Sequence, residues 1–194
     1  MKQSKEEIHN ICERYNIDNY TINDDGSIDV DDDIELSSFD LSNLPLKFNK
    51  VNGNFYCNRN HLTSLTGCPR IVVGDFWIDF NKLTSLIGCP DYVGGDFDCN
   101  DNKLLSLDGC TKEVGGDFNC SENHLTSLVN LPNALGYIDF GSNKLHHFYH
   151  TAYGSLGNDL SIFTKYMDHY EVFEPVFNEE NGLELINEIK DGLR

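Results

Sequence analysis

The sequence predicts an α/β repeat fold, a solenoid in which each turn of the chain adds one short strand to a parallel β-sheet. The first observation is a spacing of 21 residues between Leu62, Leu83, Leu104 and Leu125. The second is that the neighbouring residues repeat as well, in the order apolar-x-apolar-x-x-Asn-x-Leu, with a last and shorter copy ending at Leu145. A fixed period of this length indicates stacked repeats, because one such unit cannot bury its apolar side alone.

Residues 1–48 are expected to close the first end of the stack. A capping box precedes apolar residues at helical spacing, which predicts an amphipathic helix over residues 4–16. A β-hairpin is predicted over residues 20–30, with its turn at Asp24-Asp25-Gly26. Phe39 stands where the later repeats have asparagine, as expected of an atypical first repeat at an exposed end.

Residues 49–150 contain about five repeats. In each of them the two apolar strand residues are expected to point inward and the residues between them outward. The return path, such as Leu62–Pro69, contains glycine and proline and is too short for a helix. The repeated asparagines are expected to form a ladder whose amides bond backbone groups in the turn after each strand; they are Asn60, Asn81, Asn102, Asn123 and Asn143.

Residues 151–194 lose the repeat pattern and predict helices. The first helix is expected behind Asn158 as a possible N-cap, and the last is expected to start near Asn178. These helices would cover the apolar end that a stack of repeats otherwise exposes. The three segments are therefore expected to form one structural domain, because 44 residues alone would be marginally stable.

The repeat resembles the short leucine-rich repeats of bacterial and phage proteins. The residue pattern, for example Val114-Gly115-Gly116-Asp117-Phe118-Asn119-Cys120, is similar to that of small leucine-rich-repeat proteins of large tailed phages. The similarity extends over roughly residues 20–150. The resemblance implies a leucine-rich-repeat solenoid with a short parallel β-sheet, an N-terminal helix/hairpin cap and a C-terminal helical cap. It also implies a phage-encoded protein that binds and inhibits or redirects a host protein, such as a defence component or a nucleic-acid enzyme.

The repeat also resembles the leucine-rich-repeat region of secreted bacterial ubiquitin ligases. In those proteins a large separate domain with a nucleophilic cysteine carries the catalysis. This chain leaves no room for such a domain, so we do not carry the activity over.

The composition limits the classes of partner. The chain has 14 Lys plus Arg against 32 Asp plus Glu, a net charge of −18, so phosphate backbones and anionic membranes repel it. A protein partner with a basic surface is expected instead, without direct nucleic-acid or membrane binding. No apolar run approaches the roughly 18 residues that span a bilayer, and the start lacks a signal-peptide core, which predicts a cytoplasmic protein, in the host cytoplasm if phage-encoded. Six of the seven cysteines fall on the repeat lattice, which predicts small core residues rather than disulfides.

The outward positions of the repeats are the predicted binding site. They are rich in carboxylates and include three aromatic residues that are expected to act as interface anchors. Two alternatives remain open: the aspartates could be solvated parts of the repeat pattern, and the N-terminal hairpin or a neighbouring loop could fold over the aromatic residues. The predicted contact residues are Tyr56, Trp77, Phe80, Asp75, Asp79, Asp96, Asp98, Asp101, Asp117, Glu122 and Asp139.

Other chemistry has little support in the sequence. The acidic stretch 23–33 fits a hairpin turn better than a calcium loop, and the cysteines lack zinc-ligand spacing. His146, His147 and His150 are expected to mark the turn into the C-terminal segment. Without a catalytic motif, the chain is expected to be a non-catalytic interaction module, with no cofactor and no metal. The alternatives are an assembly protein that forms homo-oligomers and a small-molecule or nucleotide-binding protein that uses the cap region.

Overall fold

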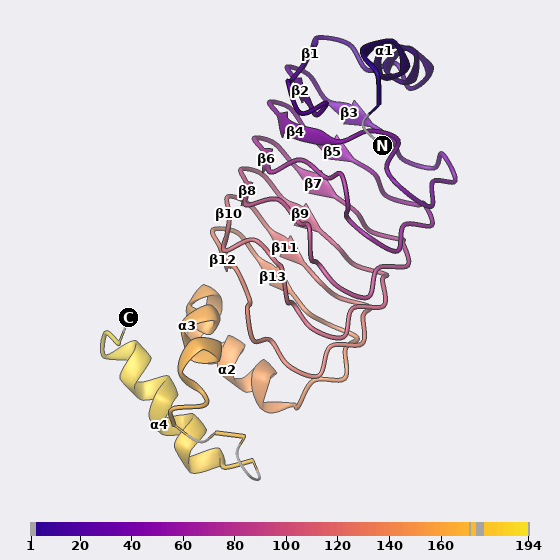
Figure 1. Ribbon diagram of the computed structural model, residues 1–194. Coiled ribbons are helices and arrows are strands. Elements are labelled where there is room, and N and C mark those ends of the chain that lie inside the picture. Colours follow the sequence, from indigo (N-terminus) through magenta and orange to yellow (C-terminus); the bar gives the residue numbers. More distant parts are fainter. Residues whose placement is uncertain (1–2, 171, 174–176, 194) are drawn as a thin grey trace.

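The structure is a parallel β-solenoid with helices at its two ends (Figure 1). It is a computed structural model that describes residues 3–170, 172–173 and 177–193. Successive repeats lie side by side, so that residues 20 or 21 positions apart in sequence occupy equivalent places in neighbouring turns. The predicted repeat architecture with a 21-residue period is therefore confirmed.

Each repeat contributes two short strands rather than the single strand that we predicted. Sheet A has the order β1 (Tyr20–Ile22), β2 (Ile28–Val30), β4 (Phe48–Val51), β6 (Ile71–Val72), β8 (Tyr92–Val93), β10 (Glu113–Val114) and β12 (Asn133–Ala134). Sheet B contains β3 (Ile34–Glu35), β5 (Phe55–Tyr56), β7 (Phe76–Trp77), β9 (Phe97–Asp98), β11 (Phe118–Asn119) and β13 (Ile138–Asp139). All pairings are parallel except that of β1 with β2.

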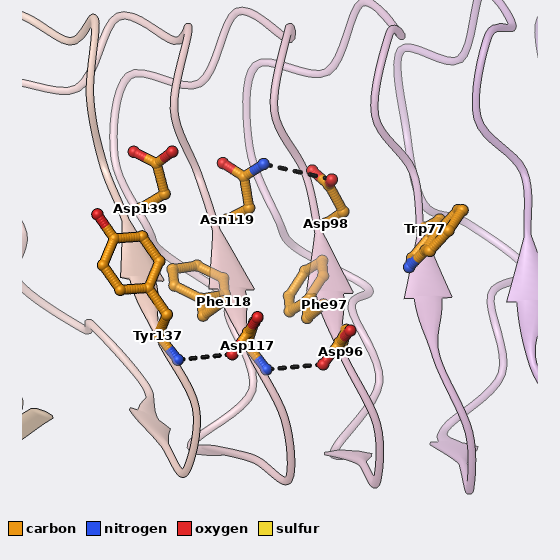
Figure 2. Close-up of a pocket in the computed structure, with 9 residues that line it drawn as sticks. All are labelled: Trp77, Asp96, Phe97, Asp98, Asp117, Phe118, Asn119, Tyr137 and Asp139. Carbon is orange, nitrogen blue, oxygen red and sulfur yellow. Dashed lines mark hydrogen bonds between the residues drawn. The ribbon is translucent and has the colours of Figure 1, made fainter.

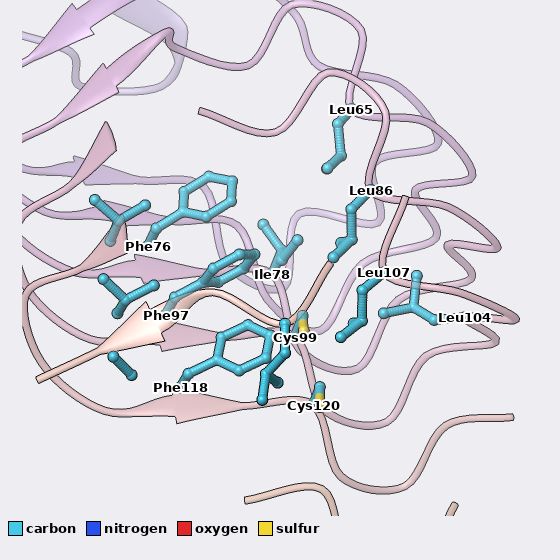
Figure 3. Packing of buried hydrophobic residues seen from close by; sticks show 14 of the residues in the cluster. Leu65, Phe76, Ile78, Leu86, Phe97, Cys99, Leu104, Leu107, Phe118 and Cys120 are labelled. Carbon is cyan, nitrogen blue, oxygen red and sulfur yellow. The ribbon is translucent and has the colours of Figure 1, made fainter. Parts of the chain in front are cut away.

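The core lies between the two sheets and the return segments. Phe55, Phe76, Phe97 and Phe118 form a column of fully buried rings with centroids 5.1–5.7 Å apart. Figure 3 shows Phe76, Phe97 and Phe118 of this column. The next inward column holds Cys57, Ile78, Cys99 and Cys120, and the return leucines close the other side. Burial of each large apolar side chain stabilises the fold by about 1.5–3 kcal/mol. The inward placement of the strand residues is confirmed.

All seven cysteines are free thiols. Cys57, Cys99 and Cys120 are fully buried, and burial raises the pKa of the Cys57 thiol to about 12. On the return side Cys68 is buried, but Cys89 and Cys110 are only partly so. The prediction that the repeat cysteines are core residues is thus confirmed for Cys57, Cys99, Cys120 and Cys68, whereas Cys89 and Cys110 lie at the edge of the core.

The asparagine ladder follows each sheet B strand. The Oδ1 atom of Asn102 accepts the backbone N–H of Leu83 in the preceding repeat (2.9 Å). Its Nδ2 donates to the carbonyls of Ile78 in the preceding repeat (3.0 Å), and of Cys99 and Asn100 (3.2 Å each). The other ladder asparagines make equivalent bonds, so the predicted ladder is confirmed.

The N-terminal elements form as predicted. Helix α1 (Lys5–Arg14) begins after Ser4, whose hydroxyl accepts the backbone N–H of Glu7, while the Glu7 carboxylate accepts the N–H of Ser4. The hairpin of β1 and β2 extends sheet A rather than sheet B. Phe39, the atypical residue of the first repeat, packs against the Tyr15 ring with centroids 5.2 Å apart.

The C-terminal segment contains one more helix than we predicted. Helix α2 (Phe148–Leu156) is followed by the short 3-10 helix η1 (Gly157–Asp159), by α3 (Leu160–Tyr166) and by α4 (Glu179–Lys190). The sequence hid α2 because Thr151 and Gly154 lower its intrinsic helix propensity. The last helix starts next to Asn178, as predicted, and the side chain of Asn178 caps it by accepting the backbone N–H of Asn181.

The predicted role of Asn158 as a helix N-cap is wrong. The N-cap of α3 is Asp159, whose side chain makes no capping bond. The Nδ2 atom of Asn158 instead donates to the carbonyl of Gly136 (2.8 Å) beside the last strand of sheet A. On sheet B the hydroxyl of Tyr153 accepts the backbone N–H of Ile138 (3.2 Å). The helices therefore bond the final strands of both sheets.

Candidate binding surface

The outer side of sheet B, here called the sheet B face, consists of four rows of side chains. Each row collects one equivalent position from the successive repeats. The first row holds Asp33, Asn54, Asp75, Asp96, Asp117 and Tyr137, and the second holds Glu35, Tyr56, Trp77, Asp98, Asn119 and Asp139. The third holds Ser37, Asn58, Asp79, Asn100, Ser121 and Gly141, and the fourth holds Ser38, Arg59, Phe80, Asp101, Glu122 and Ser142.

The first-row aspartates are bound to the backbone of the next repeat. The Oδ1 atom of Asp75 accepts the N–H of Asp96 (2.8 Å), and Oδ1 of Asp96 accepts that of Asp117 (2.8 Å). Asp117 in turn accepts the N–H of Tyr137 (2.6 Å). Stacked aspartates would repel one another by about 0.8 kcal/mol per pair in water, but a hydrogen bond to a carboxylate contributes about 1.5–3 kcal/mol. The expected destabilisation of this row is therefore offset.

A glycine precedes each of these acidic positions and makes room for the first-row side chain of the preceding repeat, which is a carboxylate at Gly95 and Gly116 and the Asn54 amide at Gly74. A Cβ atom on Gly116 would lie 2.0 Å from Oδ1 of Asp96, and one on Gly95 would lie 2.2 Å from Oδ1 of Asp75. Glycine and aspartate are therefore required together, as two parts of one contact between repeats. This contact explains why Gly-Asp belongs to the repeat pattern, which was one of the alternatives for the acidic residues.

The second row carries an aromatic pair beside carboxylates. The rings of Tyr56 and Trp77 have centroids 4.9 Å apart, and Trp77 is 38 % exposed. Further along the row, Nδ2 of Asn119 donates to Oδ2 of Asp98 (3.3 Å). The N-terminal hairpin lies in sheet A, so the alternative in which it covers these aromatic residues is wrong.

The third row is more buried than its outward position predicts. Asp79 is only 7 % exposed, so it does not add to the exposed surface as expected. Its Oδ2 accepts Nδ2 of Asn58 (3.5 Å), whereas Oδ1 of Asp79 and Oδ1 of Asn100 have no hydrogen-bond partner among the described residues. Burial raises the pKa of the Asp79 carboxyl.

The neighbouring Asp98 is also difficult to ionise. Burial raises the pKa of its carboxyl to about 6, and the charges of Asp79 and Asp139 add to the rise. Hydrogen bonds act in the opposite direction, chiefly that from the backbone N–H of Asn100 (2.9 Å). Asp98 therefore lies between two other acidic side chains of the face, Asp79 and Asp139, and close enough to both for their charges to act on it.

The fourth row projects from backbone in the left-handed region. The φ values of this row are 48–55° at Arg59, Phe80, Asp101 and Glu122. This backbone conformation redirects the chain so that the next residue is the ladder asparagine. The guanidinium of Arg59 lies 4.9 Å from the centre of the Phe80 ring. Phe80 therefore packs against Arg59, whereas Tyr56 and Trp77 pack against each other. Asp101 and Glu122 are exposed.

A hollow of about 220 Å³ opens on the sheet B face (Figure 2). Trp77 stands at one end and Tyr137 at the other, and carboxylates from the first and second rows lie between them. Tyr137 is 61 % exposed and was not among the predicted contact residues. It could have been found from its place in the last repeat, where a tyrosine replaces the first-row aspartate.

The other sites weighed in the sequence remain structural. Asp29 accepts Nδ2 of Asn49 (2.7 Å) and of Asn23 (3.2 Å), as expected of a hairpin braced by its neighbour. His146 stacks on the Phe177 ring with centroids 4.2 Å apart, and burial lowers the pKa of this histidine. Within the described ranges, no cluster of three or more His, Cys, Asp or Glu is placed to hold a metal ion, and no helix has the length and apolarity to cross a membrane.

Comparison with known proteins gives no relative: no protein-family model matches the sequence, and neither the curated proteins nor the solved structures yield a match.

Proposed function

We propose that this protein is a non-catalytic interaction module that binds a basic protein partner on the sheet B face. The observation that carries the proposal is the charge of that face. Its four rows contain one basic residue, Arg59, and ten carboxylates: Asp33, Glu35, Asp75, Asp79, Asp96, Asp98, Asp101, Asp117, Glu122 and Asp139. Such a field steers a positively charged partner and repels nucleic acid.

Exposed aromatic side chains supply the second support. Trp77 and Tyr137 stand at the two ends of the hollow, and Tyr56 packs against Trp77. Tryptophan and tyrosine are over-represented among the residues that dominate binding energy at protein interfaces. The hydrogen-bonded rows beneath them hold the face in one shape, which reduces the entropy lost on binding.

We extend the proposal to the protein's class. The strand–asparagine–leucine pattern and the ladder geometry support a leucine-rich-repeat solenoid whose terminal helices act as caps. The likeness to small phage proteins suggests a host protein in the cytoplasm as the partner. A nucleic-acid enzyme or a defence component with a basic cleft would suit the acidic face, by imitation of the charge of DNA.

The proposal is tested by capture from a bacterial lysate. The wild-type protein is immobilised and compared with a Trp77→Ala/Asp101→Lys/Glu122→Lys variant, which alters exposed positions of the sheet B face without removing a first-row aspartate. The matched control is Tyr92→Ala/Asp108→Lys/Glu113→Lys, which makes the same chemical changes at exposed positions away from that face. Captured proteins are identified by mass spectrometry at about 50 mM and about 500 mM salt.

We expect wild type and control to recover the same basic proteins at low salt, and the sheet B variant to lose them. Higher salt should weaken the capture, because screening shortens the reach of surface charge. If the sheet B variant and the control recover the same proteins as wild type, the sheet B face is not the binding surface. Competition by duplex DNA for a captured protein would separate DNA imitation from other basic partners.

A homo-oligomer is the alternative that a specific observation favours. The exposed Trp77 and the half-buried Tyr56 could meet the same patch of a second copy. Size-exclusion chromatography with light scattering distinguishes the two. A stable oligomer that dissociates on Trp77→Ala substitution would assign the patch to self-association instead.

A further inference from the structure

The hollow on the sheet B face has room for one side chain. Its volume is about 220 Å³ and it opens to solvent. Pockets for separate small molecules usually measure about 300–1,000 Å³ and enclose most of the ligand. The hollow therefore suits a side chain that reaches in from a protein partner better than a free metabolite.

The two ends of the hollow are aromatic. Trp77 lies on β7, and Tyr137 directly precedes β13, three strand positions further along sheet B. At about 4.8 Å per strand, the strands that carry the two residues lie about 14 Å apart, and Tyr137 is offset from Trp77 by a further two residues along the strand direction. Both side chains line the hollow and both are exposed. Tyr56 packs against the Trp77 ring and Tyr153 against the Tyr137 ring, and the exposed part of each ring is open to a cationic group.

The wall between the aromatic ends is negatively charged. Asp96, Asp98, Asp117 and Asp139 line the hollow, and Oδ1 of each accepts a backbone N–H of the next repeat or of its own turn. Asp98 also accepts side-chain bonds at Oδ2, from Asn100 and Asn119. No described residue donates a hydrogen bond to the Oδ2 atoms of Asp96, Asp117 and Asp139. The three ion pairs found within the described ranges involve other carboxylates, Asp25, Asp40 and Asp91. The carboxylates of the hollow therefore have no cationic partner of their own in this part of the chain.

A guanidinium group meets these conditions better than an ammonium group. It is planar, stacks on aromatic faces and presents its N–H donors in a fork that can bond two carboxylate oxygens at once. An ammonium group is a compact and more strongly hydrated charge. We infer that the hollow between Trp77 and Tyr137 receives an arginine side chain of the basic partner. The inference rests on the proposed function and names the chemical group that the partner presents.

The test uses the full chain and its single tryptophan, Trp77, as a fluorescent reporter inside the proposed site. Two peptides of equal charge serve as probes, acetyl-(Arg-Gly)₃-amide and acetyl-(Lys-Gly)₃-amide. We expect the arginine peptide to change Trp77 fluorescence saturably and to bind about fivefold more tightly than the lysine peptide. Equal affinity for both peptides would overturn the inference, because it would indicate attraction by net charge alone.

Substitutions locate the site. Tyr137→Ala and Asp139→Asn are each expected to weaken the arginine peptide about three- to fivefold, whereas Tyr137→Phe keeps the ring and should keep the affinity. The matched controls, Tyr92→Ala and Glu113→Gln on sheet A, should bind as wild type does. Circular dichroism of each variant confirms that it folds. Unchanged affinity in folded Tyr137→Ala would place the peptide outside the hollow.

The outcome is separable from that of the proposed function. If lysate capture depends on the sheet B face but the peptides do not discriminate, the interaction module stands and the arginine site is wrong. If the peptides discriminate but the sheet B variant captures the same proteins as the control, the hollow binds guanidinium without serving as the partner surface proposed above.

Discussion

At the scale of single residues, the contact between glycine and aspartate couples each repeat to the next. The Oδ1 atom of Asp96 occupies the space where a side chain on Gly116 would begin, 2.0 Å from where its Cβ would lie, and at the same time accepts the N–H of Asp117. A methyl group at this position cannot be accommodated by rotation alone, because backbone atoms of Asp96 and Gly95 lie at 3.0 Å as well. The pair fixes the separation of the repeats at the start of each sheet B strand.

Gly116→Ala is therefore expected to lower the free energy of unfolding by about 2–3 kcal/mol, measured by urea denaturation. In an Asp96→Ala background the same substitution should cost less, because the carboxylate is gone. Gly154→Ala on α2 is the matched control: a Cβ there meets nothing within 4 Å, and alanine favours helix by about 1 kcal/mol. Equal effects of the two alanines would refute the proposed contact.

Asp98 gives the face a dependence on pH. Burial raises the pKa of its carboxyl from 3.8 to about 6, so the folded protein holds this proton more tightly than the unfolded chain does. The resulting contribution to stability is complete below about pH 4 and is lost as the pH rises through about 6. The charged form is thus the less stable one in the folded protein.

Asp98→Asn should raise the free energy of unfolding by about 1 kcal/mol at a pH near 8 and change it little near pH 4. The asparagine Oδ1 can still accept the N–H of Asn100, so the turn after the strand is kept. Urea denaturation of both proteins across this pH range measures the difference. A constant difference at all pH values would show that the ionisation of Asp98 is not its cause.

At the scale of the repeat element, the asparagine ladder bonds the backbone that the short strands leave free. Each sheet B strand in the solenoid is two residues long, so strand pairing alone satisfies few of the backbone groups in a repeat. Asn102 is almost completely buried and bonds four backbone groups in two repeats.

Asn102→Ala is expected to lower the free energy of unfolding by about 3 kcal/mol, because it leaves a buried N–H and several carbonyls without a partner. Asn187→Ala, at an exposed position of α4, is the control and should change stability by less than about 0.5 kcal/mol. Thermal and urea denaturation measure both. A loss no larger than that of the control would mean that water replaces the amide at no cost.

The sequence predicts a repeat element well where a residue type has one structural use. The phenylalanines, ladder asparagines and leucines all lie where their spacing places them. The second sheet was missed because Tyr92-Val93 places one apolar residue inward and then bends at Gly94-Gly95, which leaves too little alternation to indicate a separate strand. The burial of Asp79 was missed because it depends on neighbouring side chains of other repeats, such as Asn58, rather than on its own position in the pattern.

At the scale of the whole molecule, the C-terminal helices cover the last repeat, which would otherwise be open to contact with other copies of the chain. Tyr153 bonds the N–H of Ile138 and packs on the Phe140 ring, with centroids 5.4 Å apart. Asn158 bonds the carbonyl of Gly136 next to the last strand of sheet A. Without these contacts, two adjacent strand edges and the apolar core behind them would face solvent, which favours edge-to-edge association.

A chain that ends at Leu145 is therefore expected to self-associate more strongly than the full chain. Light scattering after size-exclusion chromatography, over about a hundredfold range of concentration, measures the difference. Tyr153→Phe/Asn158→Ala, which removes the edge bonds but keeps the helices, should show a weaker tendency of the same kind. A truncated chain that stays monomeric would show that the helices do not protect the edge.

The contact between glycine and aspartate also has a consequence for how the number of repeats in the gene can change. Each inner repeat has both partners of this contact. Its glycine leaves space for the carboxylate of the preceding repeat, and its own aspartate fills the space beside the glycine of the following repeat. Removal of residues 92–112 would join Asp91 to Glu113 and bring Asp75 next to Gly116. This new contact would be of the same kind as the two contacts that it replaces, Asp75 with Gly95 and Asp96 with Gly116. Unequal recombination between copies of the repeat in the gene can thus lengthen or shorten the array by whole turns without creating a mismatched junction. Each such event would move Tyr137 relative to Trp77 by one strand, so that natural variation in copy number would adjust the span of the acidic hollow.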